Sequence, residues 1–353
     1  NETVAMDEKV LVTEFESIGT IIVNKSKPTN QPVLISSTYL YNLLSFNPND
    51  KYPPPLLIDT RTSSEFDSKF IRNSINLPLD EVQEKLPDIT ELEQLFKNQD
   101  CKRRFTWRGL HPLVIVCAES IDSTHLNNTH NNSNDNSTQG ENYSATKALQ
   151  LAHLLTNEKK AKQIFILKES FFEFFSKYPY RCHGNSIPYS PVLYEITPSM
   201  ILPWLYLGNA ENARRAEQLR VLGIQMVINC AIEAKIKQFG QISYLFFQWV
   251  DAPDFVLEGL DKIYETIEAT RKAGGKILIH CVEGKSRSAS GTIYYLMKSK
   301  GWSFQKAHDY VKFQRPLIAP NYGFVKQLQE AEAKLMPPKI VEELDEFKSE
   351  DLT

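Results

Sequence analysis

Two patterns of apolar residues alternate along most of the chain. Short continuous apolar runs, typical of buried strands, are followed by longer stretches in which apolar residues recur every three or four positions, as in amphipathic helices. The strand-like runs are residues 56–58, 75–77, 113–116, 164–167, 204–207, 225–229, 244–247 and 276–280. The helix-like stretches are residues 36–44, 145–155, 171–175, 210–222, 257–273, 289–300, 303–314 and 322–335. Such an alternation predicts parallel sheets that are covered by helices.

Polar and turn-rich segments divide this alternation into two domains. The first predicted domain covers residues 30–185 and the second covers residues 190–336, because the turn-rich segment around their junction interrupts both patterns. Residues 120–144 are almost entirely Asn, Ser, Thr and other polar residues, which predicts a solvated loop inserted in the first domain. The acidic tail at residues 337–353 is expected to lie outside the core. The expected fold class is therefore α/β, with a doubly wound first domain and a central, mostly parallel sheet in the second.

Composition and charge exclude several classes of protein. The 353 residues include 40 Lys and Arg against 43 Asp and Glu, and a net charge of −3 argues against a strongly basic nucleic-acid-binding protein. The five cysteines are too few and too scattered for a disulfide framework, so they indicate a reducing compartment, the cytoplasm or the nucleus. No apolar run reaches the roughly 20 residues that a membrane-spanning helix needs, so we expect no membrane span.

The most informative segment joins a strand-like run to a helix-like stretch. It consists of the residues His280, Cys281, Val282, Glu283, Gly284, Lys285, Ser286, Arg287 and Ser288. A helix N-terminus presents unpaired N–H groups and a positive partial charge, which bind an oxyanion and favour the thiolate form of a cysteine. This predicts Cys281 as a nucleophile and Arg287 as a bidentate ligand of a phosphoryl group. Gly284 would let the N–H groups of residues 282–287 turn inward toward that phosphate.

Two other interpretations of this segment are weaker. Gly284, Lys285 and Ser286 resemble the end of a nucleotide-binding loop, but that motif needs a glycine five positions earlier, where Ile279 stands. A buried structural Cys281 beside an exposed Arg287 is the other alternative. We favour phosphate chemistry because a strand, a turn and a helix stand in the order that it requires.

Phosphoryl transfer to a cysteine also needs an acid that protonates the leaving oxygen. Asp251 follows the strand-like run 244–247 and precedes a helix-like stretch, so it belongs at the carboxyl end of a strand, where ligands bind in open α/β sheets. Asp254 is the nearby alternative, and a solvated loop carboxylate or a helix cap would be the non-catalytic interpretation. We expect Asp251 to be the acid.

The pattern His-Cys-x5-Arg-Ser at residues 280–288 resembles the signature of the protein tyrosine phosphatases. The wider segment from about residue 195 to 335 resembles the dual-specificity phosphatases, especially the mitogen-activated protein kinase phosphatases. The resemblance also rests on residues 206–210, 227–229, 295–297 and 315–328.

This resemblance implies a role for each candidate residue. Asp251 would be the general acid, and Ser288 would help the thiolate leave in the second step. Asn321 would buttress the phosphate loop, and His280 would help to order it. The implied chemistry needs no metal and no cofactor.

The first half of the chain resembles a rhodanese domain. The resemblance rests on residues 57–76, 164–168 and 178–182. An active rhodanese carries a cysteine on a long anion-binding loop, and Cys117 follows the strand-like run 113–116 in a comparable place. Residues 118–122 contain no glycine and no cation, so they cannot form such a loop. We therefore expect an inactive rhodanese-like domain with Cys117 in its core.

The resemblance implies a phosphoprotein partner. Kinase phosphatases dock kinases through a basic cluster just after the strand that matches residues 75–77, whereas residues 78–81 here are Pro, Leu, Asp and Glu. Another basic cluster, for which a solvated face is the simpler explanation, consists of Lys102, Arg103, Arg104 and Arg108. A protein kinase stays one candidate among phosphoprotein partners, and we expect a monomer.

Several functions stay open. The leading hypothesis is a protein phosphatase that hydrolyses phosphotyrosine and phosphoserine or phosphothreonine through a cysteinyl-phosphate intermediate. Lys285 adds a cation to the loop and would also suit a phosphoinositide or RNA phosphatase. An inert first half with a polar insert resembles the STYX-like branch and would suit a phosphate-binding pseudophosphatase, although Cys281, Arg287 and Asp251 are all present. Cys230 is a candidate redox partner of the nucleophile, with an ordinary core cysteine as the alternative.

Overall fold

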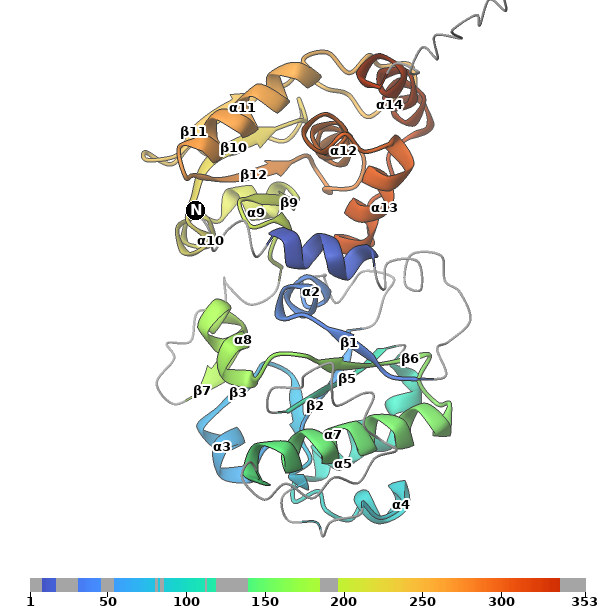
Figure 1. The fold of residues 1–353 in the computed structure, drawn as a ribbon. Helices are drawn as coiled ribbons and strands as arrows, with labels where there is room; N and C mark the ends of the chain where they lie inside the picture. The colour runs from blue at the N-terminus through green and yellow to red at the C-terminus, as the bar shows by residue number, and fades with distance from the viewer. Residues whose placement is uncertain are drawn as a thin grey trace, which may run out of the picture.

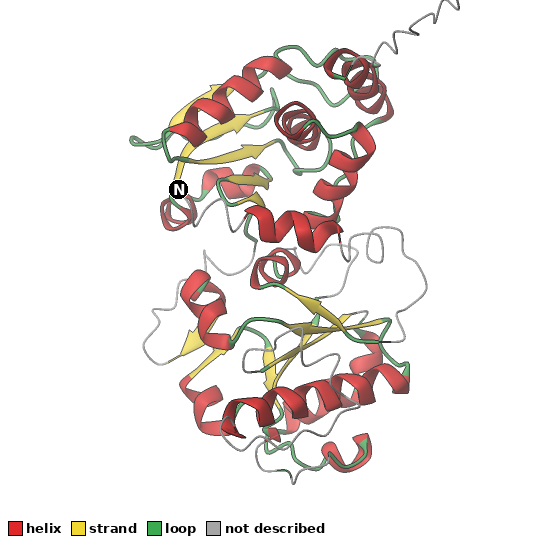
Figure 2. Cartoon of the chain, in the orientation of Figure 1, coloured by secondary structure: helices red, strands yellow, loops and turns green. Residues whose placement is uncertain are grey.

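A computed structural model describes residues 8–16, 31–45, 54–79, 82, 86–111, 113–118, 139–184 and 196–336. Two five-stranded sheets follow one another along the sequence, and helices cover both faces of each (Figure 1). Helices and strands succeed one another in both halves of the molecule (Figure 2). The predicted α/β class is therefore confirmed.

The first sheet has the strand order β1-β6-β5-β2-β4, and all of its strands are parallel. Its strands are β1 (Val33–Ile35), β2 (Leu56–Asp59), β4 (Ser74–Asn76), β5 (Leu113–Cys117) and β6 (Gln163–Leu167). One face is covered by α4 (Ile89–Leu92), α5 (Gln99–Thr106) and α7 (Gln139–Glu158), and the other by α2 (Ser37–Leu43) and α8 (Phe171–Lys177). The shorter elements are α3 (Ser63–Ser68), η2 (Arg108–Leu110), η3 (Pro179–Arg181), and the antiparallel pair β3 (Lys69–Ile71) and β7 (Cys182–Gly184). The central strands are apolar along their length because both faces are buried.

Local signals explain where the helices of this half begin. Ser36 caps α2, because its side chain accepts a hydrogen bond from Tyr39 N. Thr62 and Ser170 form capping boxes with Glu65 and Glu173, so the backbone donors at the starts of α3 and α8 are satisfied by side chains.

The second sheet has the order β11-β10-β12-β9-β8, with only β8 antiparallel to its neighbour. Its strands are β8 (Ser199–Leu202), β9 (Leu205–Gly208), β10 (Ile224–Asn229), β11 (Ser243–Phe246) and β12 (Lys276–His280). The helices are α9 (Ala210–Arg214), α10 (Ala216–Leu222), α11 (Leu260–Lys272), α12 (Arg287–Lys300), α13 (Phe304–Gln314) and α14 (Tyr322–Leu335). In the central strand, Ile277 and Ile279 pack toward α11 to α14, whereas Leu278 packs toward α9 and α10. The parallel strands β9 to β12 end at one edge, which brings the loops after them together.

The structure corrects the prediction of one helix at residues 210–222. The chain forms two helices, α9 and α10, which are separated at Arg215, where φ is −96° and ψ is 89°. The buried Asn212 side chain donates hydrogen bonds to Ile196 O at 3.1 Å and to Gln218 Oε1 at 3.0 Å. These bonds fix a turn that the apolar periodicity does not reveal.

Two predicted boundaries are also wrong. Residues 139–144, predicted as part of a loop, form the start of α7, because a helix gains one hydrogen bond for each residue that it adds to an existing turn. Helix α11 begins at Leu260 and not at residue 257, because Gly259 has a φ of 80° that a helix does not accommodate. The rest of the predicted insert, residues 120–138, lies outside the described residues, as does the tail 337–353. The predicted junction of the domains near residues 185–190 lies there as well and stays a prediction.

The apolar pattern gave no indication of a helix at residues 8–16. It lies beside α2, between the two sheets (Figure 1). The solvated basic face predicted in the first half is wrong for Arg108, which is 1% exposed and forms ion pairs with Glu93 and Glu158. The predicted position of Cys117 in the core is confirmed, because its side chain is buried at the end of β5.

Candidate active site

The candidate nucleophile lies between the central strand and a helix. Cys281 follows β12 directly, is 2% exposed, and precedes a loop that leads into α12. Its Sγ accepts hydrogen bonds from Gly284 N and from Ser288 Oγ, each at 3.2 Å. Because donors of this kind stabilise a negative charge on sulfur, the surroundings suit a thiolate.

The loop at residues 281–286 is held from outside by its carbonyl groups. Val282 O accepts from Ala210 N at 3.0 Å, and Lys285 O accepts from Ala319 N at 2.9 Å. The two carbonyls between them, of residues 283 and 284, accept from Arg315 at 3.2 and 2.9 Å. The N–H and C=O groups of a planar trans peptide point in opposite directions, so this outward bonding turns the N–H groups of the loop inward.

Gly284 is required at its place in the loop. Its φ is 69°, in the left-handed region. A Cβ there would lie 2.3 Å from Gly208 O and 2.9 Å from Arg315 Nη2. The predicted need for glycine is confirmed by both observations, since any other side chain would strain the backbone and displace the loop's support.

Arg287 begins α12 and is 3% exposed. Its Nη1 donates to a carboxylate oxygen of Glu233 at 2.7 Å and to Trp249 O at 3.2 Å. Its Nε has no hydrogen-bond partner and lies 3.7 Å from Asp251 Oδ2. The protein thus fixes one side of the guanidinium, while the N–H at Nε can donate a hydrogen bond to an oxyanion.

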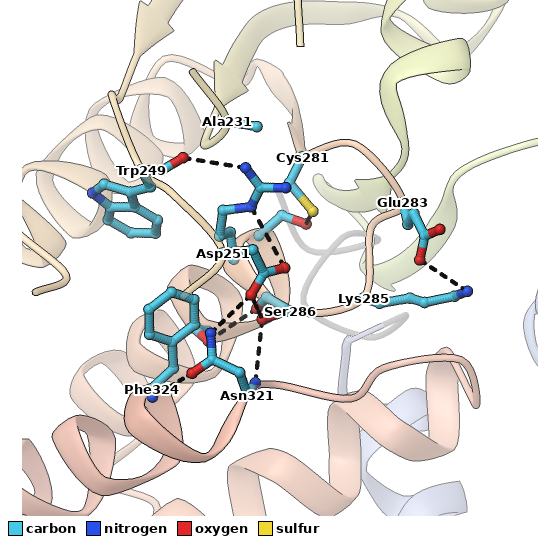
Figure 3. A network of polar contacts seen from close by, with 12 residues as sticks. Ala231, Trp249, Asp251, Cys281, Glu283, Lys285, Ser286, Asn321 and Phe324 are labelled. Atoms are coloured by element: carbon cyan, nitrogen blue, oxygen red, sulfur yellow. Dashed lines mark hydrogen bonds and ion pairs between the residues drawn. The ribbon is translucent and has the colours of Figure 1, made fainter. Parts of the chain in front are cut away.

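Asp251 is tied to the phosphate loop. Its Oδ1 accepts hydrogen bonds from Ser286 Oγ at 2.7 Å and from Asn321 Nδ2 at 2.8 Å (Figure 3). The backbone N of Asn321 also donates to Ser286 Oγ at 3.2 Å, and Asn321 caps α14. The structure therefore brings Asp251, Ser286 and Asn321 together, and these bonds to the loop belong to Asp251 and not to Asp254.

His280 lies at the base of the loop and is fully buried. Burial lowers the pKa of its imidazole to about 4, so the ring is neutral near pH 7. Its Nδ1 lies 3.1 Å from Cys281 O. This neutral ring can orient the backbone at the nucleophile without adding charge to the site.

The structure also shows the surroundings of Lys285 and Cys230, for each of which the sequence left two interpretations open. Lys285 Nζ forms an ion pair with Glu283 at 3.1 Å, on the outer side of the loop in Figure 3. Cys230 is fully buried, and burial raises the pKa of its thiol well above the usual range. The nearby Cys281 raises it further, so this environment suits a neutral core thiol, which favours the plainer of the two interpretations of Cys230.

Sequence reasoning missed Glu233 and the role of Arg315. Glu233 follows β10, whose end lies beside the end of β12 because the two strands are parallel neighbours. That register, from Asn229 opposite His280, could have drawn attention to a carboxylate four residues further on. Arg315 begins the segment 315–328, on which the resemblance to the dual-specificity phosphatases partly rests. No local sequence pattern predicts which backbone groups its guanidinium contacts.

Within the part of the chain that the structure describes, no group of His, Cys, Asp and Glu side chains has an arrangement that could hold a metal ion. None of the described helices is long and apolar enough to cross a membrane.

The fold and the geometry around Cys281 define a class, the cysteine-dependent phosphatases. Residues 205–334 match the family model of the dual specificity phosphatase catalytic domain, and residues 38–177 match that of the rhodanese-like domain. The chain thus contains a dual specificity phosphatase catalytic domain and a rhodanese-like domain, and it is a cysteine-based protein phosphatase.

Curated relatives align with most of this chain. It is 27% identical to human "Dual specificity protein phosphatase 1", over 80% of this chain and 79% of that protein. It is 28% identical to a Dictyostelium discoideum protein named "Probable rhodanese domain-containing dual specificity protein phosphatase", over 89% of this chain and 73% of that protein.

Proposed function

We propose that the protein removes phosphate from phosphotyrosine and from phosphoserine or phosphothreonine in protein substrates, with Cys281 as the nucleophile. The observation that carries this proposal is the pair of hydrogen bonds to Cys281 Sγ from Gly284 N and Ser288 Oγ. They stabilise the thiolate before attack and again when it leaves.

In the first step the Cys281 thiolate attacks phosphorus in line, the S–P bond forms and the P–O bond to the leaving group breaks. Inward N–H groups of residues 282–287 and the Arg287 Nε edge bind the equatorial oxygens, where the transition-state charge is spread. Asp251 gives its proton to the leaving oxygen. Because Ser286 and Asn321 donate to Oδ1, Oδ2 is the oxygen that can carry this proton.

In the second step water attacks the cysteinyl phosphate. Asp251, now ionised, accepts a proton from that water, the S–P bond breaks, and inorganic phosphate forms. The departing sulfur recovers its negative charge beside Ser288 Oγ and Gly284 N. The net reaction consumes one water molecule for each phosphoester and needs no other reactant.

Two alternative functions are less well supported. The ion pair of Lys285 with Glu283 neutralises the extra loop cation that would favour a phosphoinositide or RNA substrate. A pseudophosphatase that only binds phosphate would have no use for an acid held over the nucleophile's loop. A phosphorylated protein kinase is the more specific candidate among phosphoprotein substrates. We propose that the enzyme acts as a monomer. Its five free cysteines favour the cytoplasm or the nucleus, where thiols stay reduced.

The test is turnover of an aryl phosphate by the full chain in the presence of a metal chelator, with vanadate as inhibitor. Doubly and singly phosphorylated peptides are then compared with phosphoinositide vesicles of the same phosphate concentration. We expect hydrolysis of phosphopeptides in chelator, inhibited by vanadate. Vanadate binding without turnover would indicate a phosphate-binding protein, and preferential hydrolysis of the vesicles would contradict a protein substrate.

A further inference from the structure

The rhodanese-like domain contacts the phosphatase domain through α2, which lies between the two sheets (Figure 1). The Tyr39 ring stacks on the Phe313 ring, with centroids 4.5 Å apart and planes 14° from parallel. Both rings are buried. Phe313 belongs to the last turn of α13, so this contact holds the carboxyl end of a phosphatase helix against the other domain.

Asn42, one turn from Tyr39, contacts the same helix end. Its Nδ2 donates to Met200 O at 2.9 Å and to Gln314 Oε1 at 2.8 Å, and its Oδ1 accepts from Met200 N at 2.8 Å. Asn42 is 1% exposed and Gln314 is fully buried. Buried polar groups of this kind hold a defined geometry, because losing a partner leaves the other group without water.

The residue that follows α13 supports the phosphate loop. Arg315 follows Gln314 and donates from Nε to Gly284 O at 2.9 Å and from Nη2 to Glu283 O at 3.2 Å. Gly284 N in turn donates to Cys281 Sγ. Consecutive residues of one helix end therefore contact the rhodanese-like domain on one side and the catalytic loop on the other.

We propose that the rhodanese-like domain positions the phosphate loop of its own chain, through Asn42 and Tyr39 acting on Gln314 and Arg315. This inference rests on the proposed function and assigns a catalytic contribution to a domain that has no reactive cysteine. Asn42 and Tyr39 are positioning residues, since they touch neither the nucleophile nor the phosphate. When their contacts are lost, the end of α13 shifts, and Arg315 no longer fixes the carbonyl groups of residues 283 and 284.

The test compares Asn42→Ala, Gln314→Ala and the double variant in the full chain. The vanadate inhibition constant, KM and kcat for an aryl phosphate are measured, together with thermal unfolding. Both single variants remove the hydrogen bond between Asn42 and Gln314, and Asn42→Ala also removes the two bonds to Met200. We expect the vanadate inhibition constant and KM to rise about fivefold in each, because only the bond to Gln314 acts on the residue next to Arg315. The double variant should be no worse than the singles, because both break one path.

Tyr41→Phe is the matched control. It removes a hydrogen bond from Tyr41 Oη to Pro198 O, 2.9 Å long, across the same interface, and Tyr41 is as buried as Asn42. Pro198 precedes Ser199, whose Oγ accepts from Arg315 Nη1 at 3.3 Å, whereas the loop carbonyls are bound by Nε and Nη2. Tyr41→Phe should therefore lower the unfolding temperature and leave the vanadate inhibition constant unchanged. A merely structural role would lower stability or the active fraction in all variants alike, without raising KM.

An unchanged vanadate inhibition constant in Asn42→Ala would overturn the proposal, as would an equal increase in Tyr41→Phe. If Asn42→Ala does not fold, Gln314→Ala breaks the same bond from the phosphatase side and decides the question. Inactivity of the wild-type chain would instead contradict the proposed function. An active wild type with unaffected variants contradicts only the positioning by the rhodanese-like domain.

Discussion

Cys117 and Cys281 occupy equivalent places in the two halves of the molecule. Each lies at the carboxyl end of the central strand of a five-stranded sheet, β5 in one and β12 in the other. Burial raises the pKa of the Cys117 thiol, and the nearby Asp59 carboxylate raises it further. Cys281 instead receives hydrogen bonds from Gly284 N and Ser288 Oγ. Position in the sheet is thus shared, and the loop that follows decides whether the sulfur can react.

The arginines near the two cysteines differ in the same way. The Arg61 guanidinium is already paired within its own domain. It donates to Asp59 at 3.0 and 2.7 Å and to Lys69 O at 2.8 Å, and it lies over the Phe171 ring. Arg287 is held by Glu233 and Trp249 O on one side only. A guanidinium that binds a substrate must be held in place and still have N–H groups without a hydrogen-bond acceptor. Arg287 meets this condition and Arg61 does not.

The largest expected effect comes from exchanging each sulfur for oxygen. Cys281→Ser should lower turnover of an aryl phosphate by a factor on the order of 10⁴ or more, because the hydroxyl is a much weaker nucleophile. Cys117→Ser is the matched variant and should leave kcat within about twofold, since it changes only a core packing position. Steady-state assays of both variants decide the comparison. Loss of activity in Cys117→Ser at unchanged fold would mean that the first half takes part in the chemistry.

The next largest effect separates the two candidate acids. Asp251→Asn should lower kcat about 10²- to 10³-fold for a poor leaving group such as an alkyl phosphate, and far less for a nitrophenyl phosphate that needs no protonation. Asp254→Asn, the matched control three residues further on, should leave both rates close to the wild type. A leaving-group dependence that is the same in Asp251→Asn and in the wild type would remove Asp251 from the acid's role.

In both halves the buried central strands follow from the sequence, whereas one edge strand of each sheet does not. Buried strands such as β5 and β12 were predicted because continuous apolar runs leave few alternatives, and α14 was predicted at its observed limits. The edge strands β1 and β8 and the helix at residues 8–16 were not predicted, since a few residues with one covered face carry little periodic signal.

The candidate site was predicted as far as its residues are neighbours in sequence or share a strand edge. Cys281, Arg287 and Ser288 follow from one turn, and Asp251 follows from the parallel register of the sheet. No local sequence pattern predicts a contact that depends on packing between distant segments, such as the hydrogen bond between Asn42 and Gln314. The reaction and the roles of Asn321 and His280 could therefore be predicted from the sequence, whereas the support of the loop by Arg315 and Asn42 could not.

A difference in acid stability follows from the residues that precede the two cysteines. His280 is held neutral by burial with a pKa of about 4, whereas Val116 before Cys117 has no titratable group. Because its folded pKa is depressed from about 6.5, the stability due to neutral His280 is complete above pH 6.5 and is lost as the pH falls toward 4. The full loss amounts to about 3 kcal/mol.

Unfolding at several pH values measures this effect. Tryptophan fluorescence reports mainly on the phosphatase domain, which holds Trp204, Trp249 and Trp302. We expect the unfolding midpoint of the wild type to fall between pH 6.5 and 4 more steeply than that of His280→Asn, which has no titrating ring. Parallel pH profiles of the two proteins would contradict a neutral, buried imidazole in the folded state.

The smallest expected effect concerns how Arg287 is held. Glu233 is half exposed, so its charge is screened, and its contribution is a hydrogen bond that orients the guanidinium rather than a strong ion pair. Removing this bond in Glu233→Ala should raise KM about fivefold, while Glu233→Gln keeps an acceptor for Nη1 and should restore the wild-type KM. Glu211→Ala is the control, because this similarly exposed carboxylate pairs with Arg214 on the surface of α9. If Glu233→Gln were as impaired as Glu233→Ala, the charge and not the orientation would matter. Arg287 would then depend on the charge of its carboxylate partner, as Arg61 does with Asp59, although its Nε has no hydrogen-bond partner.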